Sequence, residues 1–137
     1  MSQHRIEVVQ EFGKPVEAIF DYLADHNNLS KVFGIPVKRI KDGEDDVNGV
    51  GSVRALGFAP LATEETVVAV EPNEVIEYTI TKNGGPLQNH YGRMRFSKTA
   101  RGSRLEWVIT FDSLPLLGTA VGKVLETGIR RGLKKLA

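Results

Sequence analysis

The sequence predicts an α+β fold in which a curved, seven-stranded antiparallel sheet wraps around one long C-terminal helix. Apolar residues recur every three or four positions from Leu114 to Leu136, which is typical of an amphipathic helix. Short alternating segments with short connections precede this helix, and strands joined in that way pair antiparallel. The apolar face of the helix needs a surface to cover, and only the sheet can supply it. We therefore expect an enclosed space between the sheet and the helix.

The N-terminal third of the chain is expected to form one strand followed by short helices. Residues 5–12 alternate between apolar and charged side chains, which indicates a half-buried strand. Pro15 suits the first turn of a helix, and apolar residues keep helical spacing from Val16 to Leu23. Residues 29–33 are expected to form a second short helical segment before Gly34.

The remaining six strands are expected at residues 37–41, 50–58, 63–70, 74–82, 88–97 and 104–112. In the last of them one face is strongly apolar, and it carries Leu105, Trp107, Ile109 and Phe111. Such a face points toward the core. The same alternation predicts as inward residues His90, Gly92, Met94 and Phe96 in one neighbouring strand and Ile76, Tyr78 and Ile80 in the next. In the strand at 63–70, parity alone leaves two registers open, with either Glu65, Val67 and Ala69 or Glu64, Thr66, Val68 and Val70 inward.

Composition narrows the class of protein. The 137 residues are most simply one domain, 1–137, with a formal net charge of +1. This near-neutral balance predicts no nucleic-acid partner, and the absence of cysteine excludes disulfides and thiolate chemistry. The three histidines are scattered, so we expect neither a metal site nor a cofactor. Without a signal-peptide pattern or an apolar run of about 18 residues, we expect a cytoplasmic protein with no integral membrane segment.

The long helix contains four glycines, at positions 118, 122, 128 and 132. Each costs roughly 1 kcal/mol in helix propensity relative to alanine, so another feature should explain them. Gly128 and Gly132 lie on or near the apolar face. Either the sheet approaches the helix closely there, or the missing side chains leave room for a ligand, and both explanations stay open.

Several segments together resemble the START-like (SRPBCC) superfamily, which includes the birch-pollen allergens. The similarity is strongest to its polyketide cyclase/dehydratase and lipid-transport group. It rests on 15–25 as the first helix, 49–54, the strand pair 65–78 turning at 71–73, 91–93, 102–107 and the glycine-containing last helix. This resemblance covers nearly the whole chain. It implies a helix-grip fold, with a ligand cavity between the sheet and the last helix.

In this family, loops at the cavity mouth correspond here to Gly57–Ala62 and Asn83–Leu87. Some relatives turn a glutamate into the pocket at the position of Glu65, which favours the register with Glu65 inward. The residues expected to bind the ligand are Phe58, Leu61, Glu65, Val67, Tyr78, Ile80, Leu87, His90, Met94, Trp107, Ile109, Phe111, Val121, Leu125, Gly128 and Ile129.

Glu65 and His90 form the one plausible acid/base pair, with Tyr78 on the strand between them. Three roles stay open for the pair: anchoring the polar end of a ligand, moving a proton in catalysis, or bonding within the core. If they anchor a ligand, Leu at either position should keep or raise stability while weakening ligand binding.

The function predicted from the sequence is binding of a small hydrophobic or aromatic molecule, lipid-like or polyketide-like, in an internal cavity. One alternative is a cyclase/aromatase-type enzyme that uses Glu65, Tyr78 and His90. Another is a module that modulates a partner protein. The sequence does not decide whether the chain forms a homodimer.

Overall fold

The computed structural model describes residues 1–137 and confirms the predicted α+β fold. The elements in chain order are β1 (Ser2–Phe12), α1 (Val16–Ala24), the single 3₁₀ turn η1 (His26–Asn28), α2 (Leu29–Phe33), β2 (Val37–Lys41), β3 (Val53–Leu56), β4 (Thr63–Glu71), β5 (Val75–Lys82), β6 (Gln88–Thr99), β7 (Gly102–Ser113) and α3 (Pro115–Leu136). None of the helices is both long enough and apolar enough to cross a bilayer.

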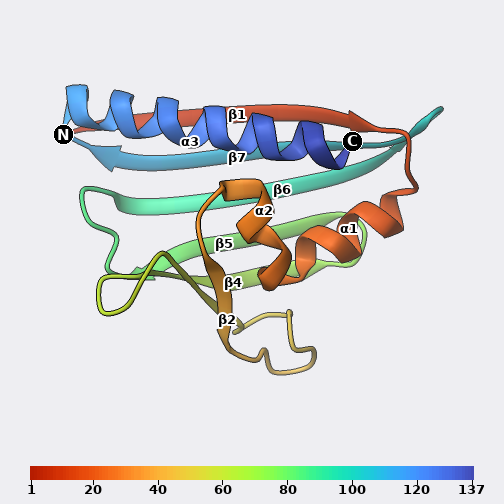
Figure 1. Cartoon of the computed structure of the whole chain (residues 1–137), viewed down its shortest axis with the longest axis horizontal. Helices are drawn as coiled ribbons and strands as arrows, with labels where there is room; N and C mark the ends of the chain where they lie inside the picture. Colours follow the sequence, from red (N-terminus) through yellow and green to blue (C-terminus); the bar gives the residue numbers. More distant parts are fainter.

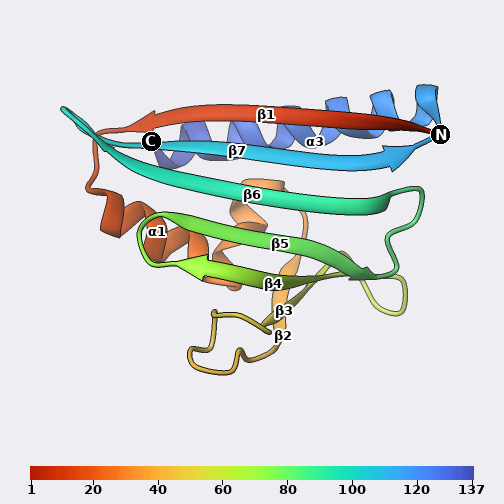
Figure 2. The ribbon, with the colours of Figure 1, turned by 180° about the vertical axis from the view of Figure 1, so that it is seen from behind.

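The seven strands form one antiparallel sheet in the order β1-β7-β6-β5-β4-β3-β2. All three helices lie on the same face, since they stand before the sheet in Figure 1 and behind it in Figure 2. Helix α3 runs along β1 and β7, while α1 and α2 cover the middle strands (Figure 1). The helices therefore cover the inner face of the sheet, with α3 over its β1–β7 edge and α1 and α2 over its middle.

The predicted inward face of the sheet is confirmed for its central strands. The buried residues include Leu105, Trp107, Ile109 and Phe111 on β7, His90, Met94 and Phe96 on β6, and Ile76 and Tyr78 on β5. Glu65 and Val67 on β4 are also buried, which settles the register in favour of Glu65.

The inward prediction for Ala69 is wrong, because β4 contains a bulge. Val67 pairs with Tyr78, but Ala69 already pairs with Glu77, so the register shifts between Val67 and Ala69. A bulge adds one residue to a strand and reverses the alternation beyond it. Val70 packs against the core in place of Ala69.

The strand expected at 50–58 is shorter than predicted and spans only Val53–Leu56. Gly51 and Gly57 flank it with φ angles of +90° and +93°, a left-handed conformation that favours glycine and interrupts a strand. Ser52 Oγ donates to Gly49 O at 2.6 Å, which closes the turn before β3.

The two open explanations for the α3 glycines apply to different positions. A Cβ on Gly132 would lie 2.3 Å from the backbone oxygen of Val32, so α2 packs directly against α3 there. A Cβ on Gly128 would meet only Phe33 O, at an ordinary contact distance of 3.5 Å. Close packing thus explains Gly132, and Gly128 is left beside open space.

Candidate functional site: an apolar cavity with a polar wall

A cavity of about 460 Å³ lies between α3, the end of α2 and the inner face of the sheet. Eleven of its fifteen lining residues are hydrophobic, which is typical of a small-molecule site. The lining consists of Phe33, Ile35, Leu56, Thr63, Glu65, Tyr78, Ile80, Leu87, His90, Ile109, Ala120, Val121, Val124, Leu125 and Gly128. Because Val124 is 75% exposed and Ile35 is 45% exposed, the mouth of the cavity lies between α3 and the turn after α2.

Nine of the sixteen residues expected to bind the ligand line this cavity: Glu65, Tyr78, Ile80, Leu87, His90, Ile109, Val121, Leu125 and Gly128. Five others, Val67, Met94, Trp107, Phe111 and Ile129, are packed into the core and do not reach it. Their alternation correctly marks them as inward. An inward side chain can meet another side chain and not the cavity, however: Trp107 packs edge-on against Phe33, and Phe111 stacks on His4.

The loop residues Phe58 and Leu61 are 77% and 82% exposed and do not line the cavity. The two loops of the predicted mouth are nevertheless joined. Asn83 Nδ2 donates to Ala62 O at 3.2 Å, and Thr63 Oγ1 donates to Asn83 O at 2.8 Å. Leu87, from the second loop, is the loop residue that reaches the cavity.

Six lining residues lie outside the set predicted from the sequence: Phe33, Ile35, Leu56, Thr63, Ala120 and Val124. Arg54 was not predicted either, although it forms an ion pair with Glu65 beside the cavity. Arg54 stands directly opposite Glu65 in the β3–β4 register. Cross-strand partners share a face of the sheet, so an inward Glu65 implies an inward Arg54. A hairpin that turns at residues 57–62 pairs Leu56 with Thr63 and therefore Arg54 with Glu65. The position of this turn was the signal available in the sequence.

Arg54 and Glu65 form a buried ion pair. Arg54 Nε donates to Glu65 Oε1 at 2.8 Å, and both side chains are less than a tenth exposed. The Arg54 guanidinium also lies over the ring of Tyr78, 4.5 Å from its centroid. Its Nη2 atom is buried without a hydrogen-bond partner. A buried charge pair of this kind leaves a costly unpaired charge if either partner is removed.

The ion pair continues into a directed chain of hydrogen bonds. Arg54 Nη1 lies 3.1 Å from His26 Nδ1, and because a guanidinium only donates, Nδ1 accepts. The ring proton of His26 is therefore on Nε2, which donates to Ser52 Oγ at 2.8 Å. Burial, reinforced by the charges of Arg54 and Arg39, lowers the pKa of His26 to about 3. His26 is thus neutral and holds Arg54 in place.

His90 presents its N–H toward the cavity and toward Glu65. The backbone N–H of Ile80 donates to His90 Nδ1 at 3.1 Å, so the proton of the neutral ring lies on Nε2. Burial lowers the pKa of His90, and the Glu65 carboxylate only partly opposes this effect. His90 Nε2 is 3.8 Å from Glu65 Oε2, which is beyond hydrogen-bond reach. The wall therefore offers one donor and one acceptor side by side.

Tyr78 forms the floor beneath this polar wall. Its hydroxyl accepts from Trp107 Nε1 at 2.8 Å, and burial raises its pKa well above the ordinary value. Its ring lies flat against β6, because a Cβ on Gly92 would sit 2.1 Å from Tyr78 Cζ. Gly92 on one side and Arg54 on the other hold the ring in position.

The sequence matches one protein family over nearly its whole length. The family model described as polyketide cyclase/dehydrase and lipid transport matches residues 3–137. The chain therefore belongs to this family, which confirms the resemblance found in the sequence. Membership points to a small hydrophobic ligand. No curated protein matches the sequence significantly.

Solved structures with the same fold include Ara h 8.0201, with a TM-score of 0.71 and 16% identity over 98% of this chain and 97% of the other. CalU16 from Micromonospora echinospora has a TM-score of 0.65 and 19% identity over 91% of this chain and 69% of the other. A protein from Thermobifida fusca has a TM-score of 0.70 and 16% identity over 94% of this chain and 85% of the other. At such low identities these similarities establish the helix-grip fold alone.

Proposed function

We propose that the protein binds a small hydrophobic or aromatic molecule, lipid-like or polyketide-like, in the cavity between the sheet and α3. The observation that carries this proposal is the cavity of about 460 Å³, whose only polar lining side chains are Thr63 at its edge and the wall formed by Glu65 and His90. Family membership supports the same ligand class. The absence of a side chain at Gly128 preserves the space for such a molecule.

The polar wall favours a ligand with a hydroxyl group at one end. His90 Nε2–H donates, and the Oε2 atom of ionised Glu65, which does not bond to Arg54, accepts. A hydroxyl both donates and accepts, so one such group satisfies both side chains. A ligand carboxylate would bring a second negative charge next to Glu65 and is disfavoured.

Catalysis by this pair has weaker support than binding. A general base needs a free lone pair toward the substrate, whereas His90 presents a proton there and uses its Nδ1 to accept from Ile80. A general acid would need the charged ring, which the lowered pKa of His90 disfavours near neutral pH. The Tyr78 hydroxyl is buried against Trp107. Neither His90 nor Tyr78 is thus prepared for proton transfer, and Glu65 Oε2 is the only atom of the three side chains that offers a free acceptor to a substrate.

The test is dye binding by a variant with a filled cavity. Gly128→Leu should abolish the fluorescence increase of Nile red while the circular dichroism spectrum stays that of the wild type. Thr119→Leu places the same side chain on the exposed surface of α3, outside the cavity, and should bind the dye normally. Unchanged dye binding by folded Gly128→Leu protein would overturn the proposal and favour a partner-binding module.

The polar wall is tested with naphthol and its methyl ether. Naphthol should bind about tenfold more tightly, since its hydroxyl can donate to Glu65 whereas the ether cannot. His90→Leu should weaken naphthol binding, because the donor at Nε2 is lost. Equal affinities for the two compounds would remove Glu65 and His90 from the site and leave the cavity itself intact. Native mass spectrometry of freshly purified protein then identifies any ligand that it retains.

A further inference from the structure

A second groove lies beside the cavity, between α2 and α3, and also has a volume of about 460 Å³. We propose that it binds an anionic group, a phosphate or carboxylate, at the outer end of a molecule whose apolar part occupies the cavity. This inference rests on the proposed function and specifies it further: the ligand is an amphiphile with an anionic head outside the cavity.

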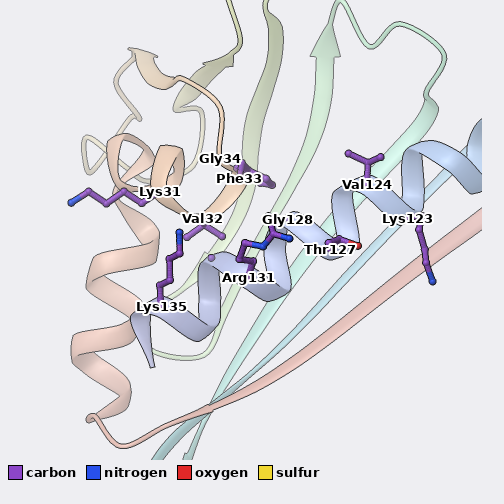
Figure 3. Close-up of a pocket in the computed structure, with 11 residues that line it drawn as sticks. Lys31, Val32, Phe33, Gly34, Lys123, Val124, Thr127, Gly128, Arg131 and Lys135 are labelled. Carbon is purple, nitrogen blue, oxygen red and sulfur yellow. The ribbon is translucent and has the colours of Figure 1, made fainter.

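The groove is basic on both walls. Its lining comprises Lys31, Val32, Phe33 and Gly34 from α2 and its end, and Lys123, Val124, Thr127, Gly128, Arg131, Gly132 and Lys135 from α3. In Figure 3, Arg131 and Lys135 rise from α3 toward α2, whereas Lys123 points away. Lys31 belongs to the lining on the α2 side, although its ammonium group extends outward from α2 in Figure 3. Arg131 and Lys135 are therefore the cations that face the groove, and no acidic residue lines it.

These cations are not neutralised by other parts of the protein. Lys31, Arg131 and Lys135 take part in no ion pair, in contrast to the neighbouring Arg130, which pairs with Glu126 at 3.7 Å. The favourable effect of cations at a helix C-terminus covers only the last turn, which contains Lys134 and Lys135. It does not cover Arg131, which precedes this last turn, or Lys31, which is on another helix.

The groove and the cavity share Phe33, Val124 and Gly128 in their linings. A molecule that leaves the cavity past the exposed side chain of Val124 therefore meets Arg131 next. The direct backbone contact of Gly132 with Val32 holds the two helices at this spacing. A guanidinium recognises a phosphate or carboxylate through paired N–H donors, and the lysine ammonium groups add charge.

The first experiment compares decanol with decyl phosphate, which share a chain and differ in the head group. Their affinities are measured by displacement of Nile red from the wild type and from the double variant Arg131→Gln/Lys135→Gln. Exposed charge pairs are worth up to about 1 kcal/mol each, so decyl phosphate should bind the double variant about three- to tenfold more weakly. Decanol affinity should change less than twofold, and high salt should erase the difference between the proteins.

The matched control is Lys38→Gln/Lys41→Gln, which removes two exposed, unpaired cations from β2 and changes the net charge equally. It should leave both affinities unchanged. Equal weakening of decyl phosphate binding by both double variants, or no weakening by either, would overturn the groove assignment. If decanol fails to bind the wild type while decyl phosphate still depends on Arg131 and Lys135, the cavity proposal fails and the groove stands.

The anionic head can belong to a free amphiphile or to a lipid in a bilayer. Sedimentation with phosphatidylcholine vesicles, with and without phosphatidylglycerol, separates the two sources. Pelleting that needs phosphatidylglycerol and is lost in Arg131→Gln/Lys135→Gln assigns the groove to a lipid headgroup. Discrimination of decyl phosphate in solution without pelleting assigns it to a free amphiphile. Absence of both effects refutes the inference.

Discussion

Removing the Glu65 carboxylate should destabilise the protein strongly, because it leaves the Arg54 charge buried without its partner. Both side chains are less than a tenth exposed, and their atoms are 2.8 Å apart. Breaking a buried pair of this kind costs about 3–5 kcal/mol. The ion pair reverses the expectation from the sequence that Glu65→Leu keeps or raises stability. That expectation assumed a carboxylate without a cationic partner.

The size of this loss makes it easy to measure. A domain of this kind has a free energy of unfolding of about 5–15 kcal/mol, so Glu65→Leu should forfeit a large share of it. The corresponding fall in Tm is roughly 10–20 °C. Urea titration and thermal melts of the wild type and the variant, followed by circular dichroism, supply both values.

The matched control is Glu64→Leu, at the preceding position of β4. Glu64 pairs with Lys82 at 3.8 Å on the surface, and an exposed pair is worth about 0–1 kcal/mol. The double variant Arg54→Met/Glu65→Leu, which removes both charges, should recover most of the loss. If Glu65→Leu loses no more stability than Glu64→Leu, the buried pair does not hold the wall and the reasoning is refuted.

Two further predictions concern the histidine chain and the helix glycines. The pKa of His26 is lowered to about 3 in the folded state, so the unfolded state binds more protons below pH 6.5. The free energy of unfolding should therefore fall with decreasing pH below 6.5 by up to about 1.4 kcal/mol per pH unit. His26→Gln should show a shallower slope when urea titrations are repeated across this pH range. Equal slopes for the two proteins would contradict a neutral, buried His26. In thermal melts Gly128→Ala should be up to about 1 kcal/mol more stable than the wild type. Gly132→Ala should be less stable, since its Cβ would collide with Val32 O; the opposite ranking would contradict the packing described.

Most of the fold was predictable because the chain alternates clearly where it is half-buried. Leu105 to Phe111 show one apolar face, and that face is the buried one. The bulge in β4 was not predictable, because Val67, Val68, Ala69 and Val70 are all apolar and alternation cannot show where the register shifts. The alternation of apolar and polar residues therefore predicts a strand and its buried face. The position of a bulge depends on how the strand pairs with its neighbour, which the alternation does not show.

The site was only partly predictable, for a related reason. Parity along β5 and β6 predicted an inward Tyr78 and His90, whereas parity along β4 left Glu65 open and only the family resemblance favoured it inward. All three side chains line the cavity in the structure. Which inward residues meet open space and which meet other side chains depends on how the helices lie over the sheet. Phe33 comes from a five-residue helix, and Val124 is an exposed residue of α3, so neither was recognisable as part of a wall before the helices were placed.

The two glycines on opposite sides of the cavity have a practical consequence for engineering its specificity. On the sheet side, Gly92 lets the Tyr78 ring lie flat against β6, which sets how far the cavity extends toward the sheet. On the helix side, Gly128 has no side chain to fill the cavity. A larger residue at Gly92 would displace the ring together with the Arg54 cation stacked on it. A Cβ at Gly128 meets only Phe33 O, at an ordinary contact distance of 3.5 Å, and a larger residue there extends into the cavity. Ligand size can thus be tuned from the helix, one side chain at a time, without disturbing the charged wall.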